Sequence, residues 1–338
     1  LVEHGRRIGG RATTRKSRKN KILEFDHGLP SINFSKNMSA ELKAFILPFI
    51  HSKKLVDISN EIFMINEFGD IDNVLTTDKI YRSLPFMINF CEEIINQSIN
   101  PKKINFLFQS ITKSIKRIND LWEVKYDNER LIKSKSLILS SSLIAHPRCL
   151  NILKINSLPL RDAFIPGEDE VVDSLLSQVC KQKYLQRRVY ILYAAKSDMP
   201  KNFNHKYIQI CFSKIIRENL NFERIIFQKQ SDGSIVILLH CFYINRIFKI
   251  DSDKIITSLI SIFRKKKEYI DLFLKSRLID KMDWRSSQPL NHLLSKDLQW
   301  SSISNIGFCG DWFDLKNSTG VEAAMNSSIR LAKLLSWK

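Results

Sequence analysis

The sequence predicts an α+β protein with an antiparallel sheet in its middle and a βα unit near its C-terminus. Three observations carry this prediction. Asp232-Gly233 separates two β-rich runs, as in a tight hairpin, because glycine accepts the positive φ that the turn needs. Apolar residues recur at spacings of three and four in 40–51 and 84–97, as in amphipathic helices. Finally, an apolar strand at 303–310 precedes a helix at 321–335.

Strand patterns follow one another through the middle of the chain. Residues 122–126 alternate as a strand does, and 136–141 form a short apolar run of the buried type. Further β-rich runs occupy 189–195, 207–213, 225–230 and 235–243. We therefore expect 189–243 to form an antiparallel sheet. The basic segment 251–276 that follows has the spacing of one or two helices.

Length and composition bound the class of protein. The 338 residues are enough for two domains, and 44% hydrophobic with 26% charged residues is an ordinary globular composition. The longest uncharged runs fall short of the roughly 20 apolar residues of a membrane span, and no signal-peptide pattern opens the sequence. Six dispersed cysteines, none in a Cys-x-x-Cys pair, argue against structural zinc and for a reducing compartment. We expect a cytoplasmic protein without a metal site or membrane segment.

The charge of the chain offers an alternative function. The 53 Lys and Arg against 35 Asp and Glu leave a formal net charge of +18, and the segment 6–21 concentrates basic residues. A basic module that binds nucleic acid or another anionic partner would have such an excess. No helix-turn-helix, RNA-recognition or zinc-finger signature accompanies it, and net charge does not determine a fold. We keep this alternative but expect no nucleic-acid partner.

The first group of residues suited to chemistry lies near the N-terminus. An apolar pair can end a strand at Glu3, whose carboxylate is then free to accept hydrogen bonds from a diol, as the acid of dinucleotide folds does. Gly9 and Gly10 let the backbone approach a ligand closely because no Cβ intervenes. Arg11 and Arg15 suit phosphate oxygens. A flexible basic loop that contacts no ligand is the alternative interpretation.

The second group lies near the C-terminus, in GFCGDW at 307–312 and GVEAA at 320–324. A short strand ending at Gly310-Asp311 can project a carboxylate toward a polyol. A helix starting at Gly320 presents free N–H groups and a positive dipole end. Alone, this is an ordinary strand-loop-helix. Together, the two groups offer a ribose-holding acid, a glycine pair with arginine, a polyol-holding Asp and a helix end, which a flavin dinucleotide needs.

These motifs, with Thr14-Arg15 and Phe25-Asp26-His27-Gly28, resemble the renalase-like branch of the FAD-dependent amine-oxidase superfamily. Trp284-Arg285 resembles the Trp-Arg that lies near the active site on a substrate-domain strand of that family. The resemblance covers both ends of the chain well and the middle only through the order of its elements.

The resemblance implies a discontinuous Rossmann-like FAD-binding domain of residues 1–36, 100–147 and 300–338. It also implies an inserted substrate domain of residues 37–99 and 148–299, built on the antiparallel sheet. FAD would bind non-covalently, through Glu3, Gly9, Gly10, Arg11, Arg15, Gly28, Gly310, Asp311, Gly320, Val321, Glu322 and Ala323. His27, Trp284 and Arg285 would lie near the substrate as catalytic residues.

Individual roles follow from the same resemblance. Glu3 would hold the adenosine ribose, while Gly9, Gly10 and Arg11 would lie along the pyrophosphate and ribityl chain. Asp311 would bind the ribityl or phosphate region. The backbone of 321–323 would approach the pyrimidine end of the flavin, where the helix dipole stabilises negative charge.

The implied activity is hydride transfer to flavin from a small amine or a dihydronicotinamide-type substrate, such as a reduced nicotinamide. Dioxygen or another acceptor would reoxidise the flavin. This chemistry is largely the cofactor's, so no catalytic triad is required.

The sequence departs from the family's pattern in one major respect. Such families begin with a strand and a Gly-x-Gly-x-x-Gly turn, whereas the glycines here follow the acid Glu3 rather than precede it. We expect that the opening βα unit, about 30 residues long, is missing from this sequence, or that the cofactor site has been partly lost. A degenerate, non-catalytic flavoprotein fold is therefore a further alternative. Residues 29–34 also differ from the family's pattern, so the wall on the substrate side of the pocket is expected to differ from that of the family.

Overall fold

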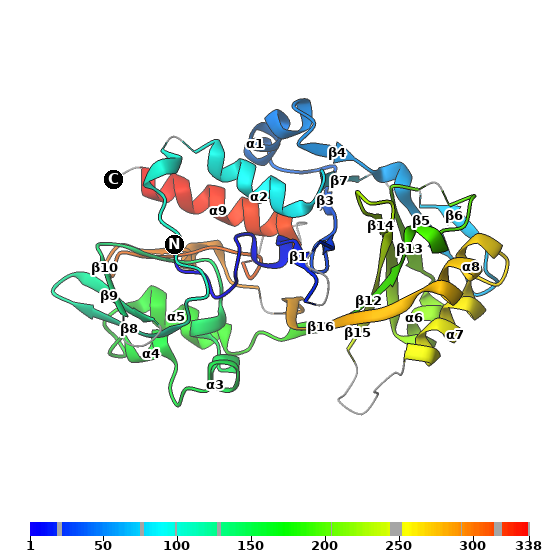
Figure 1. Cartoon of the computed structure of the whole chain (residues 1–338). Helices are drawn as coiled ribbons and strands as arrows, with labels where there is room; N and C mark the ends of the chain where they lie inside the picture. The colour runs from blue at the N-terminus through cyan, green and yellow to red at the C-terminus, as the bar shows by residue number, and fades with distance from the viewer. Residues whose placement is uncertain are drawn as a thin grey trace.

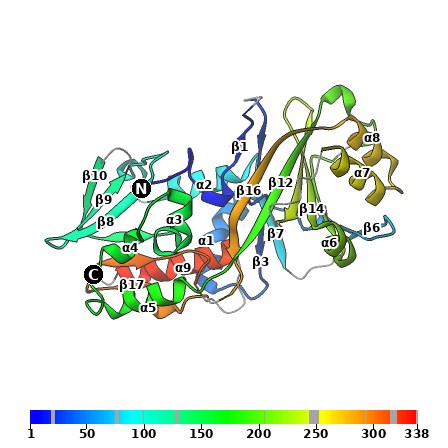
Figure 2. The ribbon, with the colours of Figure 1, turned by 90° about the horizontal axis from the view of Figure 1, so that it is seen from below.

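The computed structural model describes residues 1–18, 22–74, 78–98, 100–126, 130–203, 205–243, 252–291, 293–313 and 320–336. Two bodies lie side by side (Figure 1). One holds a seven-stranded sheet with helices on its outer face, and the other holds both ends of the chain. Figure 2 shows the long strands β12 and β16 running together between the two bodies.

The large sheet has the strand order β16-β12-β15-β14-β13-β5-β6. Its strands are β5 (Ile62–Ile65), β6 (Ile71–Asn73), β12 (Tyr184–Ala194), β13 (Tyr207–Phe212), β14 (Phe222–Lys229), β15 (Ile235–Phe242) and β16 (Arg277–Pro289). The Asp232-Gly233 hairpin is confirmed, because β14 and β15 pair antiparallel around it and Gly233 has φ +85°. The antiparallel sheet predicted for 189–243 is confirmed, since β12, β15, β14 and β13 pair antiparallel in that order. The whole sheet is mixed, because β5 joins β13 in parallel.

Period-two alternation gives this sheet two apolar faces. The outer face packs Phe212, Ile237 and Leu239 against helices, with Phe263 and Phe273 from those helices in the same cluster. These helices are α6 (Lys214–Leu220), α7 (Ser252–Ile262) and α8 (Lys267–Lys275), and the last two confirm the helices expected in 251–276. The inner face carries an apolar cluster that includes Phe25 of β2 (Glu24–Phe25), so the N-terminal segment shares a core with the large sheet.

The second body contains a βα unit and a meander. Strand β11 (Leu137–Leu139) pairs in parallel with β18 (Ile306–Phe308), which also pairs with β17 (Trp300–Ser301). The meander comprises β8 (Thr112–Ile118), β9 (Leu121–Tyr126) and β10 (Arg130–Ser134), and beside it lie α3 (Arg148–Leu153), α4 (Pro159–Asp162) and α5 (Glu170–Val179). The side chains of α4 and α5 pack in one cluster with those of β9, β11 and β18. Where the domain limits fall remains a prediction.

A third layer covers the junction of the two bodies. It consists of β1 (Arg15–Lys16), β2 (Glu24–Phe25), β3 (Ile32–Phe34), β4 (Leu55–Asp57), β7 (Lys79–Ser83), α1 (Ala40–His51), α2 (Met87–Asn96) and α9 (Gly320–Ser336). The helices predicted at 40–51, 84–97 and 321–335 are therefore confirmed. Their apolar faces meet in one cluster with β3 and β4.

The strand predicted at 303–310 is shorter in the structure. It spans Ile306–Phe308, because Gly310 adopts φ +135° and turns the chain just beyond it. Residues 314–319 of the predicted loop, and residues 19–21 at the end of the basic run, lie outside the described residues. Among the helices that the structure describes, none combines the length and apolar character needed to cross a bilayer.

Candidate functional site

Asp26 stands where the two bodies meet, directly after β2. It is fully buried, with Oδ1 accepting hydrogen bonds from Thr14 Oγ1 at 2.6 Å and from the backbone N–H of Met87 at 3.1 Å. Its Oδ2 lies 3.6 Å from the guanidinium of Arg82. Gln228 of β14 accepts from the backbone N–H of Asp26, which ties this residue to the large sheet. One carboxylate thus joins the N-terminal segment, a helix and a strand.

The same contacts explain how α2 begins. The N-cap position of this helix is Phe86, which offers no side-chain hydrogen bond to the free N–H groups of the first turn. Asp26 accepts from Met87, and Thr14 Oγ1 accepts from the N–H of Ile88 at 3.2 Å. The cap therefore comes from residues distant in sequence. Burial nevertheless raises the pKa of Asp26 to about 6, against the opposing effect of Arg82.

His27 lies next to Asp26 and contacts Trp284 of β16. The centroids of the two rings are 5.2 Å apart with a tilt of 36°, and His27 is 3% exposed. Burial, and secondarily the charge of Arg15, lowers the pKa of His27 to about 3, so its imidazole is neutral at physiological pH. His27 Nδ1 and Trp284 Nε1 are both buried without a hydrogen-bond partner. The structure thus brings together two of the three predicted catalytic residues.

Arg285 is placed differently. Side chains alternate along a strand, so Arg285 projects from the face of β16 opposite to Trp284, and it is exposed. The structure does not bring it next to His27. A role for Arg285 at the substrate remains a prediction.

The Gly-Gly-Arg segment packs against Gly28. A Cβ added at Gly28 would lie 2.3 Å from the carbonyl oxygen of Arg11 and 2.8 Å from Trp284. Gly9 and Gly10 have φ values of +95° and +53°, in the left-handed region that glycine enters without strain. The sequence therefore requires glycine here for two different reasons, which are close approach at position 28 and backbone conformation at positions 9 and 10.

Arg11 joins the two predicted groups of residues. Its Nη2 lies 2.7 Å from Asp311 Oδ1, and its Nη1 donates to the carbonyl oxygen of Ser287 on β16. Asp311 is 8% exposed, and its Oδ2 is buried without a partner among the described residues. The neighbouring Gly310 N–H donates to Ser327 Oγ of α9 at 2.7 Å, which fixes the turn that presents Asp311.

Several other predicted residues already have partners within the chain. Arg15 Nη2 is 2.7 Å from Asp280 Oδ2 of β16, so its charge is compensated there. Glu322 is 4% exposed and accepts hydrogen bonds from the N–H and the hydroxyl of Ser35, at 2.7 and 2.8 Å. Glu3 Oε1 accepts from the N–H of Gly5 at 2.5 Å, and Val2 forms a parallel bridge with Leu107.

The remaining predicted residues lie at the first turn of α9. Gly320 begins the helix with φ +56°. Val321 packs against the apolar cluster of α1 and β3, and Ala323 is buried. The side chains of Val321, Glu322 and Ala323 thus pack within the chain, and a contact of this turn with a cofactor stays a prediction.

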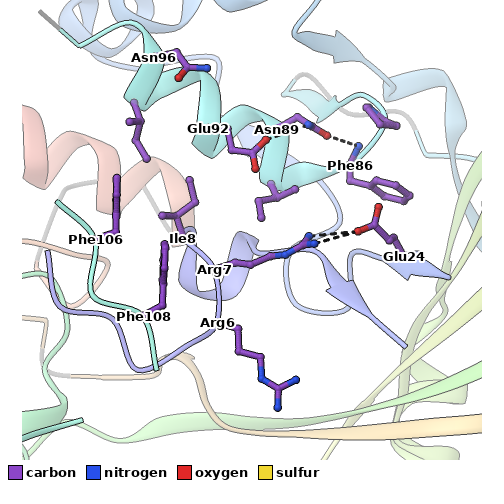
Figure 3. Close-up of a pocket in the computed structure, with 13 residues that line it drawn as sticks. Arg6, Arg7, Ile8, Glu24, Phe86, Asn89, Glu92, Asn96, Phe106 and Phe108 are labelled. Atoms are coloured by element: carbon purple, nitrogen blue, oxygen red, sulfur yellow. Dashed lines mark hydrogen bonds and ion pairs between the residues drawn. The ribbon is translucent and has the colours of Figure 1, made fainter. Parts of the chain in front are cut away.

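A separate groove of about 540 Å³ lies between α2 and the segment before β8 (Figure 3). The rings of Phe106 and Phe108 lie parallel on one side, with centroids 5.5 Å apart. Arg7 reaches across it to Glu24 at 3.4 Å, as Figure 3 shows. None of the predicted site residues is among those that line this groove.

Sequence reasoning missed three polar residues at the junction, of which Asp26 and His240 are buried and Arg224 is partly buried. Asp26 belongs to the Phe25-Asp26-His27-Gly28 motif named in the sequence analysis, but its hydrogen bonds to three separate segments were not predicted. Arg224 and His240 lie on adjacent strands of the large sheet. Nothing in the sequence marked them as functional residues, because each belongs to a strand with an ordinary apolar pattern. Within the described residues, no three His, Cys, Asp or Glu side chains gather in a way that could hold a metal ion.

Comparison with solved structures relates this architecture to known proteins. A protein from Exiguobacterium sp. 255-15, assigned as a protoporphyrinogen oxidase, superposes with a TM-score of 0.61 at 9% identity, covering 100% of this chain and 93% of that one. A triple mutant of putrescine oxidase, made in a redesign of cofactor binding, gives 0.57 at 10% identity, with the same two coverages. The chain shares the fold of these two oxidases.

The other comparisons do not extend the likeness beyond the fold. An oxidoreductase from Methanosarcina mazei matches at 12% identity with a TM-score of 0.45, covering 77% of this chain, and the match spans 56% of that protein's length. No protein-family model matches the sequence, and no curated protein matches it. At these identities, the likeness concerns the fold alone.

Proposed function

We propose that the chain is an FAD-dependent oxidoreductase of the renalase-like branch of the amine-oxidase superfamily. The observation that carries the proposal is the ion pair between Arg11 and Asp311. It joins the Gly-Gly-Arg segment to the Gly-Asp turn, which are the two motifs that the sequence links to a flavin dinucleotide. The fold shared with two oxidases supports the same conclusion.

The residues around this pair fit such a ligand. Asp311 has a buried Oδ2 without a partner, and an unpaired buried carboxylate oxygen is costly unless a donor reaches it. The hydroxyl groups of a ribityl chain are donors of that kind. Arg11 is only half-buried, so its guanidinium can also reach phosphate oxygens. The glycines at positions 9, 10 and 28 leave the backbone accessible from close range.

Four parts of the dinucleotide are assigned to residues of the chain in this proposal. Glu3 would hold the adenosine ribose through the carboxylate oxygen that Gly5 does not use. Arg11 and Asp311 would hold the pyrophosphate and the ribityl chain. The first turn of α9 would face the flavin ring with its backbone N–H groups, since the Glu322 carboxylate is already held by Ser35.

The bound flavin would supply the capacity to accept a hydride. The substrate would be a small amine or a dihydronicotinamide-type molecule, and dioxygen or another acceptor would complete the cycle. His27 and Trp284 would form an apolar wall that excludes water beside the reacting groups. Because His27 is neutral, this wall adds no positive charge where a hydride leaves the substrate.

FAD binding to the purified chain tests the proposal. We expect FAD fluorescence to change on titration with the chain, and riboflavin, which lacks the pyrophosphate and adenosine, to bind much more weakly. The variant Asp311→Asn keeps an acceptor and the volume of the side chain but removes the charge that orients Arg11. A folded wild-type chain that binds neither FAD nor riboflavin would contradict the proposal.

A further inference from the structure

The inner face of the large sheet carries an arginine, Arg224, to which no described residue offers a direct hydrogen bond or ion pair. Arg224 of β14 is partly buried on this face, between Cys211 of β13 and His240 of β15 in the strand register. Among the residues that the structure describes, its guanidinium forms no hydrogen bond or ion pair, and its Nε is buried without a partner. Burial of an unpaired guanidinium is unfavourable because the charge loses water and gains no partner.

Other arginines at this junction are compensated. Arg187 binds Glu223 through Nε at 2.5 Å and through Nη2 at 2.9 Å. Arg15 pairs with Asp280, and Arg82 lies beside Asp26. Arg224 is thus the exception in this set, because none of the described residues forms a hydrogen bond or ion pair with it. The negative charge beside it is the Glu223 carboxylate, which Arg187 already holds and whose pKa, against the effect of burial, the charge of Arg224 helps to lower.

His240 stands directly opposite Arg224 across the two strands. It is 1% exposed, and its Nε2 is buried with no hydrogen-bond partner. Burial, followed by the charges of Arg224 and Arg187, holds the pKa of His240 well below its usual range, so the ring is neutral. A neutral imidazole can present one N–H to an acceptor. His27 is close enough to His240 to influence the same pKa.

Two more unpaired ring nitrogens lie near this pair. His27 Nδ1 and Trp284 Nε1 lack partners, and Trp284 is opposite Arg187 in the register of β16 and β12. Trp284 Nε1 can only donate. Among the described residues, the junction therefore gathers unsatisfied hydrogen-bonding groups around one arginine that lacks a direct partner, and native structures rarely leave such groups unsatisfied without a functional reason.

We propose that Arg224 and His240 bind an anionic group of the substrate, a carboxylate or a phosphate, beside His27 and Trp284. The proposal rests on the proposed function in that it assigns this junction to the substrate. It narrows the substrate class to amines or dihydronicotinamides that carry such an anion. A carboxylate or phosphate oxygen would pair with the guanidinium in charge-assisted hydrogen bonds and would accept the N–H of His240.

Calorimetric titration of the chain without FAD tests this site. The probes are benzoate and inorganic phosphate, with benzamide as a neutral control of the same shape as benzoate. We expect one of the two anions to bind and benzamide not to bind. Arg224→Gln should weaken the anion's binding by about tenfold or more, since a charge-assisted hydrogen bond is lost. Binding of benzoate would indicate a substrate with a carboxylate, and binding of phosphate would indicate a phosphorylated substrate.

Lys229→Gln is the matched control. Lys229 lies on the same strand and is exposed, so this substitution removes the same charge without touching the site. We expect it to leave anion binding unchanged. If both substitutions weakened anion binding equally, the loss would come from the lower net charge of the chain, and the proposal would be overturned. A folded wild-type chain that binds neither anion would overturn it as well. FAD binding is measured separately, so either proposal can fail while the other stands.

Two further measurements do not depend on affinity. The imidazole nitrogen resonances of His240 should shift when the anion is added, and this shift should disappear in Arg224→Gln. Arg224→Met retains the length of the side chain and removes the unpaired charge, so it should unfold at a higher urea concentration than the wild type. A lower midpoint would show that Arg224 has a structural partner and would contradict the proposal.

Discussion

The Arg11 guanidinium lies 2.7 Å from Asp311 Oδ1, although the two residues belong to opposite ends of the chain. Arg11 also donates to the carbonyl of Ser287 on β16, so one side chain connects the N-terminal loop, the C-terminal turn and the large sheet. The position of the proposed flavin site between the two bodies depends on this connection.

Asp311→Asn should weaken FAD binding more than it weakens the fold. The pair is partly exposed, so its loss should lower the free energy of unfolding by no more than about 1 kcal/mol. The lost charge should raise the dissociation constant of FAD about tenfold, which corresponds to about 1.4 kcal/mol. Fluorescence titration and urea unfolding measure the two effects. Equal FAD affinity in variant and wild type would show that Asp311 does not contact the cofactor.

Gly28→Ala should disturb the Gly-Gly-Arg segment. The added Cβ would meet the Arg11 carbonyl at 2.3 Å, so the backbone must shift, at a cost of about 2 kcal/mol. Gly10→Ala is the control, since a Cβ there meets nothing within 4 Å and only the φ of +53° is strained. We expect about 1 kcal/mol for the control. Urea unfolding compares the two, and a larger loss in Gly10→Ala would contradict the close packing at Gly28.

Asp26 should make the chain less stable as the pH rises from about 4 to about 6. Its folded-state pKa of about 6 is above the ordinary value of 3.8, so the folded chain binds this proton more tightly than the unfolded chain does. Its stabilising contribution is therefore complete below about pH 4 and is lost as the pH rises through 6. The difference amounts to about 3 kcal/mol.

Asp26→Asn isolates this contribution, because asparagine can still accept from Thr14 and Met87 through its amide oxygen. The free energy of unfolding is measured in urea at several pH values for both proteins. The value for the wild type minus the value for the variant should fall as the pH rises from about 4 to about 6. Other carboxylates titrate equally in both proteins and cancel in the difference. A difference that rises with pH would mean that Arg82 overcomes the cost of burial.

Trp284→Ala should raise the pKa of His27. In the wild type, burial under Trp284 lowers this pKa to about 3, so the His27 ring should not titrate between about pH 5 and 8. Removing the indole admits water, and the pKa should move toward the ordinary value of 6.5. Proton NMR of the imidazole follows the titration, with His27→Gln providing the assignment. Trp284→Phe keeps an apolar cover and should preserve the low value.

Much of the local structure followed from sequence patterns. The hairpin at Asp232-Gly233 was predictable because the turn needs a positive φ at Gly233 and the flanking runs are rich in β-forming residues. The helices of 40–51 and 84–97 were predictable from their apolar spacing. The parallel addition of β5 was not, because nothing in the period of a strand specifies the direction of its neighbour.

The sequence by itself predicted the central hairpin, the helices at 40–51, 84–97 and 321–335, and the motifs at both ends of the chain. It gave no prediction for other elements, such as α5 and β5. Only the tertiary structure decided which polar groups stay unpaired. Arg15 and Arg224 are both partly buried arginines, yet Asp280 forms an ion pair with Arg15 while no described residue forms one with Arg224. A charge's partner depends on contacts between segments distant in sequence, whereas periodicity reports only on neighbours within a few residues.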